Sequence, residues 1–342
     1  MNFASDNAFG AAPEILAALG TASAGAVPSY GDDEITQRVG RRLAEIFDHE
    51  LAVYPVVTGT AANSLALATL CPPHGAVFCH AESHIATDEC AAPEFFSHGA
   101  KLVGLDGACG KLTPDLIQAA LPGFWRGVHS PKPSVVSITQ LTELGTAYAP
   151  DEVKALADFA HNWNMALHMD GARFANALVH LGCQPADVTW RAGVDALSFG
   201  ATKNGALCAE AVIFFDKAKA ADFEYRRKKS GHLLSKMRFV SAQLDAYLAG
   251  DLWLSNARRA NALAHKLADA LRTAKGVTIA HPVDGNQVFA ELPVELSDKL
   301  RAAGAHYYDW APAKDGRVLV RLVTSFITPE NDVEAFVKLA RA

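Results

Sequence analysis

Short apolar segments rich in Val, Ile and Phe alternate with helix-forming stretches along most of the chain. Segments of this length and composition predict β-strands. Their regular alternation with helices predicts an α/β protein with a mostly parallel sheet covered by helices. The predicted strands are residues 53–57, 76–79, 101–105, 134–139, 165–170, 194–199 and 211–215, and the predicted helices include residues 61–70, 114–120 and 150–162.

The pattern changes after about residue 240. A long helical stretch over 237–275 is interrupted near 249–253. It is followed by predicted strands at 277–282, 287–292 and 318–323 and by predicted helices at 293–303 and 329–340. This second pattern predicts a smaller C-terminal α/β domain. No Pro/Gly-rich linker separates the two patterns, so we expect the domains to pack closely.

Composition and charge narrow the class of protein. Half of the 342 residues (50%) are apolar, which predicts a sizeable core, and the net charge of −6 argues against nucleic-acid and anionic-membrane partners. The basic run at 225–229 is interpreted as a solvated helix face, with a phosphate or subunit contact as the alternative. No apolar run reaches the ~18 residues of a membrane span, and the first residues lack a signal-peptide pattern.

The cysteines form no C-x-x-C pair and show no metal-binding spacing, so we expect no metal site. Several lie in apolar stretches, which indicates buried thiols in a reducing cytoplasm. The six are Cys71, Cys79, Cys90, Cys109, Cys183 and Cys208.

Residues that carry chemistry follow several predicted strands, and open α/β sheets bind ligands at the carboxyl ends of their strands. Thr58, Gly59 and Thr60 follow the strand at 53–57 and begin a helix. Free N–H groups and the helix dipole at such a position favour a phosphate. Taken alone the T-G-T motif is weak, because similar turns begin many helices.

Three further strands end near ionisable side chains. The segment "GATKNG" surrounds Lys203 with small residues. A solvated lysine does not need small neighbours, but a lysine that must meet the flat ring of a ligand at close range does. Asp170 precedes Lys203 by 33 residues, about one strand–helix–strand unit, so the two side chains are expected to reach one pocket from neighbouring strands. The other candidates at strand ends are His80, His84 and Arg173.

Pyridoxal 5′-phosphate needs a phosphate cradle, a lysine for its aldehyde, a carboxylate for its pyridine nitrogen and a flat partner for its ring. Lys203, Asp170 and His84 supply the last three. The alternatives are a helix cap for Asp170, a solvated lysine and a satisfied loop histidine. Each alternative is the commoner fate of one residue. Together with an ordinary turn at Thr58–Thr60, however, they require four independent coincidences in chain order.

The segments "LHMDGARFANA" and "LSFGATKNGALCAEAVIF" resemble the threonine aldolases, which are fold-type I pyridoxal-phosphate enzymes. "FASDNAFGAAPEIL", "SYGDDEITQRVGRRLAEIF", "TGTAANSLAL" and "LVRLVTSFIT" match in the same order, so the resemblance covers essentially the whole chain. It implies an N-terminal segment, 1–30, that contributes to the active site and the small domain. It also implies a large cofactor-binding domain at 31–245 with a seven-stranded sheet, and a small domain at 246–342.

The resemblance also implies roles for single residues. Lys203 would hold the cofactor as an internal aldimine, and Asp170 would pair with the pyridine nitrogen. His84 would lie on the ring face. The phosphate would be held by Gly59 and Thr60, with Arg238 contributing, and Arg173 would also lie at the cofactor. The substrate's α-carboxylate would be held by Ser5, Arg173 and Arg321, although Arg321 alone is also open to interpretation as a paired strand-edge arginine. Tyr30 is expected to reach the site of a neighbouring subunit, in a homodimer or homotetramer.

The implied activity is retro-aldol cleavage of L-threonine or L-allo-threonine to glycine and acetaldehyde in the cytoplasm. Many members carry a histidine after the fourth strand, but residues 137–150 contain none. We therefore expect His84 to act as the base, directly or through a water that Gln140, Thr142 or Glu143 orients. His168, on the same strand face as Asp170, is interpreted as a core histidine bonded to the backbone, with a supporting role at the site as the alternative.

Two other functions stay open at this point. Within enzymes, the alternatives are a lyase for another β-hydroxy amino acid, such as phenylserine, and a β-eliminating lyase. Outside enzymes, the alternative is a catalytically silent binding protein that keeps the fold. The retained Lys203 and the absence of any basic or helix-turn-helix appendage argue against the silent protein.

Overall fold

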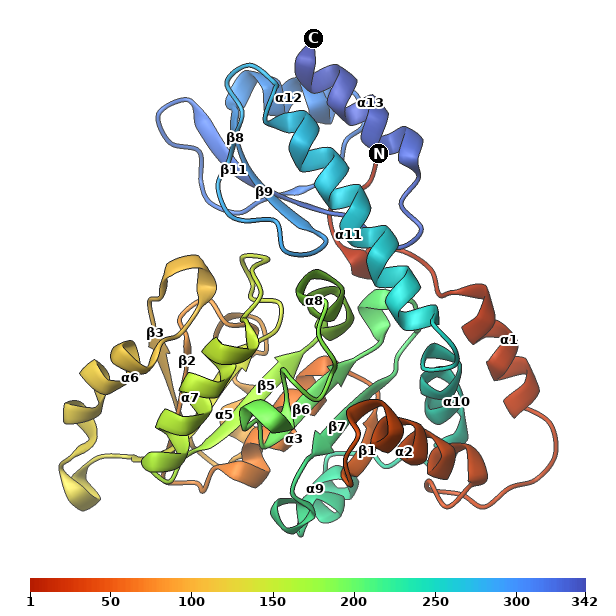
Figure 1. The fold of residues 1–342 in the computed structure, drawn as a ribbon, viewed down its shortest axis with the longest axis vertical. Helices are drawn as coiled ribbons and strands as arrows, with labels where there is room; N and C mark the ends of the chain where they lie inside the picture. Colours follow the sequence, from red (N-terminus) through yellow and green to blue (C-terminus); the bar gives the residue numbers. More distant parts are fainter.

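A computed structural model describes all residues, 1–342, and shows two parts, each built on its own sheet (Figure 1). The larger sheet has seven strands in the order β1-β7-β6-β5-β4-β2-β3, and the smaller has four in the order β10-β11-β9-β8. The strands are β1 (Ala52–Val56), β2 (Gly75–His80), β3 (Lys101–Leu105), β4 (Lys132–Thr139), β5 (Ala166–Gly171), β6 (Ala196–Gly200), β7 (Glu210–Phe214), β8 (Thr278–Ile279), β9 (Gln287–Pro293), β10 (Tyr308–Asp309) and β11 (Arg317–Val323).

Helices precede, connect and follow these strands. They are α1 (Pro13–Ala22), α2 (Glu34–Phe47), α3 (Gly59–Leu70), α4 (His84–Thr87), α5 (Ala92–Phe96), α6 (Pro114–Ala120), α7 (Pro150–Asn162), α8 (Phe174–Leu181), α9 (Phe223–Lys229), α10 (Arg238–Tyr247), α11 (Leu252–Leu271), α12 (Val294–Ala302) and α13 (Glu330–Arg341). The predicted break in the helical stretch after residue 237 is confirmed, because α10 and α11 are separate helices.

The large sheet is parallel except for β7, which pairs antiparallel with both β1 and β6. The mostly parallel seven-stranded sheet predicted from the sequence is confirmed. The exception has a local cause. Parallel neighbours need a crossover of a dozen residues or more, whereas the connection from β6 to β7 is only residues 201–209. This short connection carries Lys203.

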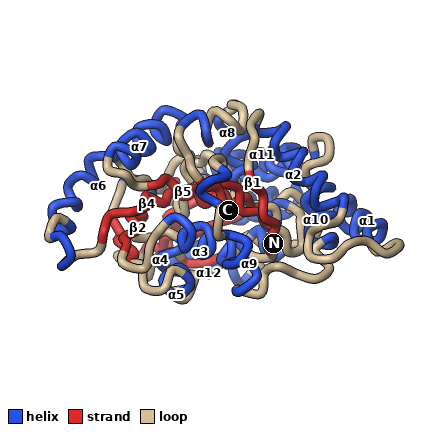
Figure 2. Tube along the Cα trace, turned by 90° about the horizontal axis from the view of Figure 1, so that it is seen from below, coloured by secondary structure: helices blue, strands red, loops and turns tan.

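Helices cover both faces of the large sheet. Helix α3 packs against β5, β6 and β7 and against α5 and α9, so these three helices lie on one face. Helix α7 packs against β4 and β5 on the opposite face, with α6 beside it. Figure 2 shows the strands enclosed between the two helix layers. Both faces of the central strands are therefore buried, which accounts for their continuous apolar sequences.

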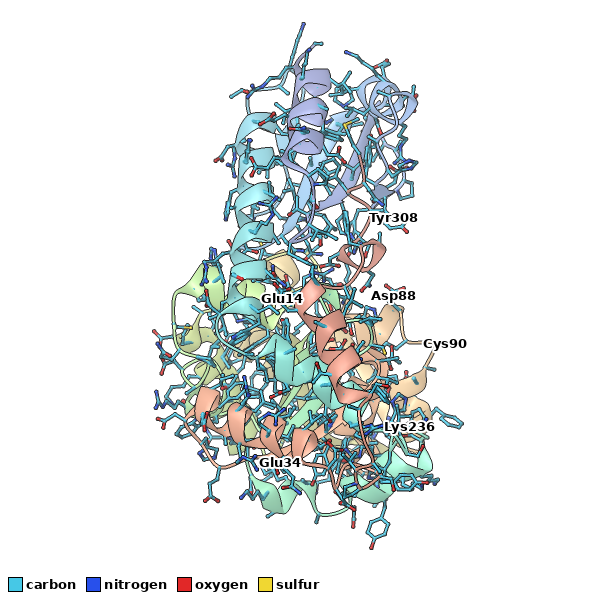
Figure 3. The ribbon with its side chains drawn as sticks, turned by 90° about the vertical axis from the view of Figure 1, so that its right-hand side faces the viewer. Glu14, Glu34, Asp88, Cys90, Lys236 and Tyr308 are labelled. Carbon is cyan, nitrogen blue, oxygen red and sulfur yellow. The ribbon has the colours of Figure 1, made fainter.

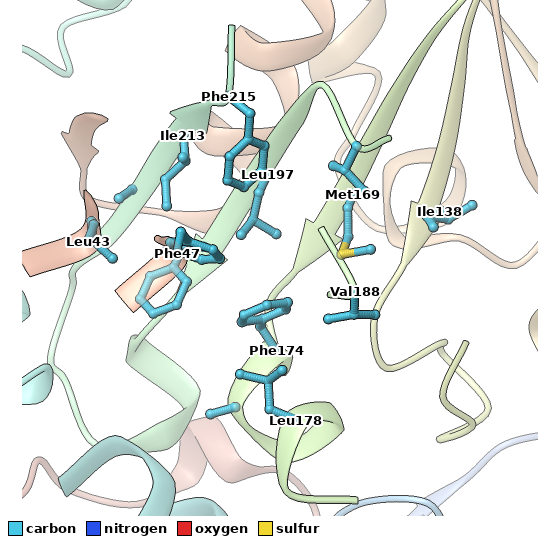
Figure 4. Close-up of a cluster of buried hydrophobic side chains, with 14 of the residues drawn as sticks. Leu43, Phe47, Ile138, Met169, Phe174, Leu178, Val188, Leu197, Ile213 and Phe215 are labelled. Carbon is cyan, nitrogen blue, oxygen red and sulfur yellow. The ribbon is translucent and has the colours of Figure 1, made fainter. Parts of the chain in front are cut away.

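Aromatic side chains fill the core between the sheet and α2, α8 and α10. Phe47 of α2 contacts Phe174, Phe199 and Phe215, with ring centroids 5.9, 6.4 and 5.4 Å apart. Three of these rings are fully buried, and Phe215 is 6% exposed. Figure 4 shows this cluster, in which Phe174 begins α8 and Leu197 belongs to β6. The cluster fixes the positions of β5, which contains Asp170 near its end, and of β6, which precedes Lys203.

The smaller part packs its antiparallel sheet against α11 and α12, and α13 packs against both of these helices. Helix α11 extends from the larger part into the smaller one (Figure 1). The N-terminus joins the smaller part, because Asn2 bridges to His306 and the Phe3 ring packs edge-on against Phe336 at 5.2 Å. The domain boundaries at residues 30 and 245 stay predictions, although these contacts agree with the expected role of the first residues.

Two local expectations were wrong, and a third was confirmed only in part. The strand predicted at 277–282 is only Thr278–Ile279, and β10 was not predicted because two residues carry no period-2 signal. The basic run at 225–229 is largely solvated, as expected, but Arg227 is 5% exposed and lies over the Tyr54 ring. Only Cys71 and Cys79 are buried, although all six cysteines are free. No helix has the length and apolarity needed to cross a membrane.

Gly200, the last residue of β6, provides a test of this packing. A Cβ at this position would lie 2.7 Å from both the Cα and the carbonyl oxygen of Ala172, which are backbone atoms that cannot turn aside. We expect Gly200→Ala to lower the free energy of unfolding by about 1–3 kcal/mol, because it forces apart the ends of β5 and β6. Urea unfolding of the purified variant measures this loss.

Gly40→Ala is the matched control, because Gly40 lies inside α2 and no atom is within 4 Å of its would-be Cβ. Replacing a helical glycine with alanine stabilises by about 0.5–1 kcal/mol. Equal unfolding midpoints for the two variants would contradict the close approach of β6 to Ala172.

Candidate active site

A cavity of about 550 Å³ opens at the carboxyl ends of the central strands, between the larger and the smaller part. The larger part contributes Thr139, Asp170 and Lys203 to its wall. The smaller part contributes Tyr308, Trp310 and Arg321, and the N-terminal segment contributes Ser5 and Asn7. Figure 3 shows Tyr308 on the upper part and Asp88 on the lower part on the same side of the molecule; both border the cavity.

Asp170 and Lys203 reach the cavity from neighbouring strands, as the spacing predicted. Strands β5 and β6 are paired in parallel, with Asp170 opposite Ser198. Asp170 lies at the end of β5, and Lys203 lies in the short 3₁₀ turn Thr202–Asn204 that follows β6. Both residues line the cavity. The two groups that matter most to the predicted chemistry are therefore brought together.

The Asp170 carboxylate is held by two hydrogen bonds. Asn63 Nδ2 donates to Oδ2 at 2.7 Å, and the Ala172 N–H donates to Oδ1 at 2.9 Å. The residue is only 5% exposed. The carboxylate is thus presented to the cavity in a fixed orientation.

Lys203 lies among charges of both signs. Burial lowers the pKa of its amine, and the nearby Arg173 guanidinium lowers it further, whereas Asp6, Asp170 and Glu210 oppose this shift. Glu210 begins β7 and accepts the Ala201 N–H at 3.1 Å, which holds the turn that carries Lys203. Burial raises the pKa of Glu210 to about 7. A lysine with a lowered pKa offers more neutral amine, which is the form that attacks carbonyl groups.

His84 lines the cavity and is held at two points. Its Nδ1 lies 2.8 Å from Glu89 Oε1, and its backbone N–H donates to Glu143 Oε1 at 2.8 Å. Glu89 Oε1 also accepts from Asn63 at 2.8 Å, so a hydrogen-bonded chain runs from His84 through Glu89 and Asn63 to Asp170. The hydrogen bond to Glu89 raises the pKa of His84.

Asn63 and Glu89 were missed by the sequence analysis. Asn63 is the one amide side chain in α3, whose other residues are small, apolar or hydroxyl-bearing, and this was a usable signal. Glu89 follows α4 in an ordinary polar stretch, and nothing in the sequence marks it as buried at 3% exposure. Its importance depends on a partner 26 residues away, which only the folded chain brings near.

Two arginines face the cavity, but they differ in their partners. Arg173 makes a bidentate ion pair with Asp6, at 2.8 and 2.9 Å. Burial opposes ionisation of Asp6, but the charge and hydrogen bonds of Arg173 prevail and lower its pKa. Arg321 has no carboxylate partner; its guanidinium carbon lies 5.0 Å from the Trp310 ring centroid, and its Nε is buried without a hydrogen bond.

Arg321 therefore keeps its charge without an ion pair. Burial lowers its pKa, and the charge of Arg173 lowers it further. Its strand β11 lies between β9 and β10, so the alternative of a paired strand-edge arginine is wrong. Two nearby guanidinium groups, of which Asp6 neutralises only one, form a site for an anion. Ser5 also borders this region of the cavity.

The start of α3 has the features expected of a phosphate site. Thr58 caps the helix by accepting the Ala61 N–H at 3.1 Å. The N–H groups of Gly59 and Thr60 have no partner in the chain. Gly59 lines the cavity, and no atom lies within 4 Å of the position that a Cβ would take there. The Thr60 side chain is not part of the cavity wall, so only its N–H is placed to contribute.

Three expected residues are not brought to the cavity of their own chain. Arg238 is engaged elsewhere, because its guanidinium donates to the Gly25 carbonyl at 3.1 Å. Tyr30 is 45% exposed, with Lys228 4.4 Å from its ring centroid. His80 Nε2 is paired with the Gly107 carbonyl at 3.0 Å. Within one chain, the role expected of Arg238 is thus not met.

The loop after β4 corrects another expectation. Gln140 uses both side-chain groups on the backbone of Tyr148, at 2.8 and 2.9 Å, and Thr142 bonds to Thr146 and to the Cys109 carbonyl. Neither Gln140 nor Thr142 lines the cavity, because their polar atoms hold the loop together. Of the three residues expected to orient a water, only Glu143 lies in the wall.

His168 is fully buried beneath the site and is bonded to side chains rather than to the backbone. Its Nδ1 lies 2.9 Å from Ser137 Oγ, and its Nε2 lies 3.0 Å from Ser198 Oγ. It therefore connects β4, β5 and β6 at a position two residues before Asp170. Burial lowers its pKa to about 4.

Comparisons with known proteins agree with this site. Residues 2–294 match the family model of the beta-eliminating lyases. The chain is 44% identical over 340 residues to the low specificity L-threonine aldolase of Pseudomonas aeruginosa, covering 99% of this chain and 96% of that protein. It also resembles the solved structure of Leishmania major threonine aldolase, with a TM-score of 0.94, 28% identity and coverage of 99% and 98%.

A more distant likeness concerns the fold alone. The serine palmitoyltransferase of Sphingomonas wittichii superposes with a TM-score of 0.72 at 14% identity, over all of this chain (100%) and 86% of that one. The fold-type I architecture predicted from the sequence is thereby confirmed.

The low pKa of His168 predicts a pH dependence of stability. In the unfolded chain a histidine takes up a proton below its ordinary pKa of 6.5, whereas folded His168 resists protonation down to a pKa of about 4. The contribution of neutral His168 to the free energy of unfolding is therefore fully present above pH 6.5 and is lost as the pH falls toward 4. The loss amounts to roughly 3 kcal/mol. We expect His168→Gln to flatten the fall in the free energy of unfolding over this range.

The measurement is urea unfolding at several pH values, with His265→Gln as control, since His265 is exposed on α11. The control should keep the parent's pH dependence. An unchanged slope in His168→Gln would show that folding does not lower the pKa of His168.

Proposed function

The chain belongs to the beta-eliminating lyase family, with the low specificity L-threonine aldolases among its relatives, and from this premise we propose that it cleaves the Cα–Cβ bond of β-hydroxy-α-amino acids. The substrates are L-threonine and L-allo-threonine, and the products are glycine and acetaldehyde. The observation that carries the proposal is the placement of Lys203, Asp170 and an unpaired Arg321 around one cavity. A silent binding protein would not need this combination.

The residues of the cavity fit pyridoxal 5′-phosphate. The free N–H groups of Gly59 and Thr60 would hold the phosphate, the Lys203 amine would hold the aldehyde carbon, and Asp170 would pair with the ring nitrogen. Several buried polar atoms of the wall lack a partner in the chain, among them Asn63 Oδ1 and both polar atoms of the Gln287 side chain. Buried polar groups are rarely left unpaired, so these atoms support a polar ligand.

The bound cofactor supplies an aldehyde that joins the substrate's amino group and a ring that draws electrons from Cα. The chain supplies orientation. Asp170, fixed by Asn63, keeps a negative charge where the ring nitrogen needs a proton. The lowered pKa of Lys203 keeps its amine ready to exchange with an incoming amino group.

Arg321 is proposed to bind the substrate's α-carboxylate, with Arg173 and Ser5 beside it. Arg173 is already engaged by Asp6 through Nε and one terminal nitrogen, so it helps mainly by adding positive charge. Arg321 retains its donors for a ligand. When the substrate's carboxylate and its amino group are both held, the orientation of Cα is fixed. This orientation determines which bond of Cα can break. His84 borders the same space and offers Nε2, since Nδ1 is taken by Glu89.

A homodimer or homotetramer is proposed as the functional form, and Tyr30 and Arg238 are proposed to act across a subunit boundary. Both lie outside their own chain's cavity but close to the loop that contains Gly25. A second chain is therefore the way in which Arg238 would reach a phosphate. The free cysteines, with no disulfide among them, agree with the proposed cytoplasmic location.

Aldehyde release tests the proposed function. We expect purified protein to release acetaldehyde and glycine in equal amounts from L-threonine, only when pyridoxal phosphate is bound. Lys203→Ala should abolish release, because the proposed anchor of the cofactor is removed. Lys154→Ala, an exposed residue of α7, is the control and should keep full activity.

The β-eliminating alternative gives a different product. The name of the matched family model favours it as the second candidate. Formation of 2-oxobutyrate and ammonia in place of acetaldehyde and glycine would identify elimination and refute aldol cleavage.

Arg321 gives an independent test of substrate placement. Hydrogen bonds to a charged group contribute about 1.5–3 kcal/mol, so Arg321→Gln should raise KM for L-threonine roughly 10- to 100-fold. Arg317→Gln is the control, because Arg317 lies on the same strand but pairs with Glu291. Steady-state kinetics of the two variants measure the difference. A normal KM in Arg321→Gln would exclude it as the carboxylate anchor.

A further inference from the structure

Glu143 lies in the cavity wall, and the chain donates hydrogen bonds to only one of its two carboxylate oxygens. It lies after β4 and lines the cavity with Thr139 and His84. Its Oε1 accepts two hydrogen bonds, from the His84 N–H at 2.8 Å and from the Thr139 hydroxyl at 2.9 Å. These bonds fix the orientation of the carboxylate plane.

The second oxygen, Oε2, is shielded from solvent and has no hydrogen-bond partner. Leaving a buried acceptor unpaired costs about 1–3 kcal/mol, and native structures contain few such atoms. A ligand in the cavity that donates a proton or a hydrogen bond would satisfy Oε2. The Glu143 side chain borders the cavity, so its carboxylate is the group that such a ligand would meet.

Of the other carboxylates at the cavity, Glu82 and Asp88 are exposed to solvent, and Asp309 pairs with Arg301. His84 uses Nδ1 to bond Glu89, which raises the pKa of its ring and leaves only Nε2 free. Both oxygens of Asp170 are engaged by Asn63 and Ala172. Gln287 also has unpaired polar atoms, but an amide is not a base.

We propose that the Glu143 carboxylate is the base that removes the proton of the substrate's β-hydroxyl, which assigns to Glu143 the step expected of His84. The inference rests on the proposed function. The hydroxyl proton passes to the Glu143 carboxylate, and the electron pair left on the hydroxyl oxygen forms the carbonyl of the leaving aldehyde. The Cα–Cβ bond breaks with its electrons kept on the Cα side, and Cα then takes up a proton to become glycine.

The surroundings of Glu143 suit this role. Burial raises the pKa of its carboxyl, and the negative charge of Asp170 on β5 raises it further, against the hydrogen bonds of His84 and Thr139. The other titratable groups facing it are Cys79 of β2 and Tyr148 of its own loop. A base with a pKa nearer to neutrality transfers protons more effectively than an ordinary glutamate.

The Glu143→Gln variant distinguishes a role as proton acceptor from a role in holding the site together. The glutamine carbonyl can still accept from His84 and Thr139, but it cannot take a proton. We expect kcat for acetaldehyde release from L-threonine to fall about 10²- to 10⁴-fold. Exchange of the α-protons of glycine with deuterated water, followed by NMR, should change less than about threefold, because glycine has no β-hydroxyl. The absorption band of the bound cofactor and the affinity for glycine should be unchanged.

Glu94→Gln is the matched control, because Glu94 of α5 also carries a shielded, unpartnered Oε2 but does not line the cavity. The control should keep both aldehyde release and exchange. In the parent protein, kcat for release should fall on the acidic side as Glu143 becomes protonated, and this limb should be absent in Glu143→Gln.

Three results would overturn the proposal. Full aldehyde release by Glu143→Gln would show that another group takes the proton. An equal loss of release, exchange and glycine binding would show that Glu143 only supports the scaffold. A parent protein that exchanges glycine protons but cleaves no β-hydroxy amino acid would refute the proposed function itself, and the base assignment with it.

Discussion

The parallel pairing of β5 with β6 is the constraint on which the site depends. It places the end of one strand, with Asp170, beside the end of the other, after which the chain turns and presents Lys203. The two ends approach so closely that a Cβ on Gly200 would overlap the backbone of Ala172. The small residues around Lys203 are therefore required by the crossing of two chain segments, as well as by any ligand that lies against them.

Charges around the cavity are distributed by segments that lie far apart in the sequence. Asp6 of the N-terminal segment neutralises Arg173 of the large part and leaves Arg321 of the small part unpaired. On the other side, Asn63 connects Asp170 to Glu89 and so to His84. One wall is thus prepared for a carboxylate and the other for a cationic ring nitrogen, and the same fold holds both. This separation is what a single amino acid bound to a pyridine ring requires.

Much of this could be predicted from the sequence, because the order of strands and helices determines which strand ends meet. The spacing from Asp170 to Lys203 indicated a shared pocket, and the apolar segments located every strand of the large sheet to within two residues at each end, with β3 matching its bounds. The partners of buried polar residues could not be predicted, since Asn63, Glu89 and Asp6 acquire their roles only through contacts across the fold. The loop after β4 shows the same limit: its sequence offered three polar side chains, and packing left only Glu143 facing the cavity.

The central claim is that Asp170 and Lys203 hold one pyridoxal ring between neighbouring strands. The most direct measurement is the ¹⁵N NMR shift of the pyridine nitrogen, with labelled cofactor bound to the parent protein and to Asp170→Asn. The account predicts a protonated nitrogen in the parent at about pH 8, because a paired carboxylate keeps that charge, and an unprotonated nitrogen in the variant. An unprotonated nitrogen in the parent, or the same shift in both proteins, would contradict it.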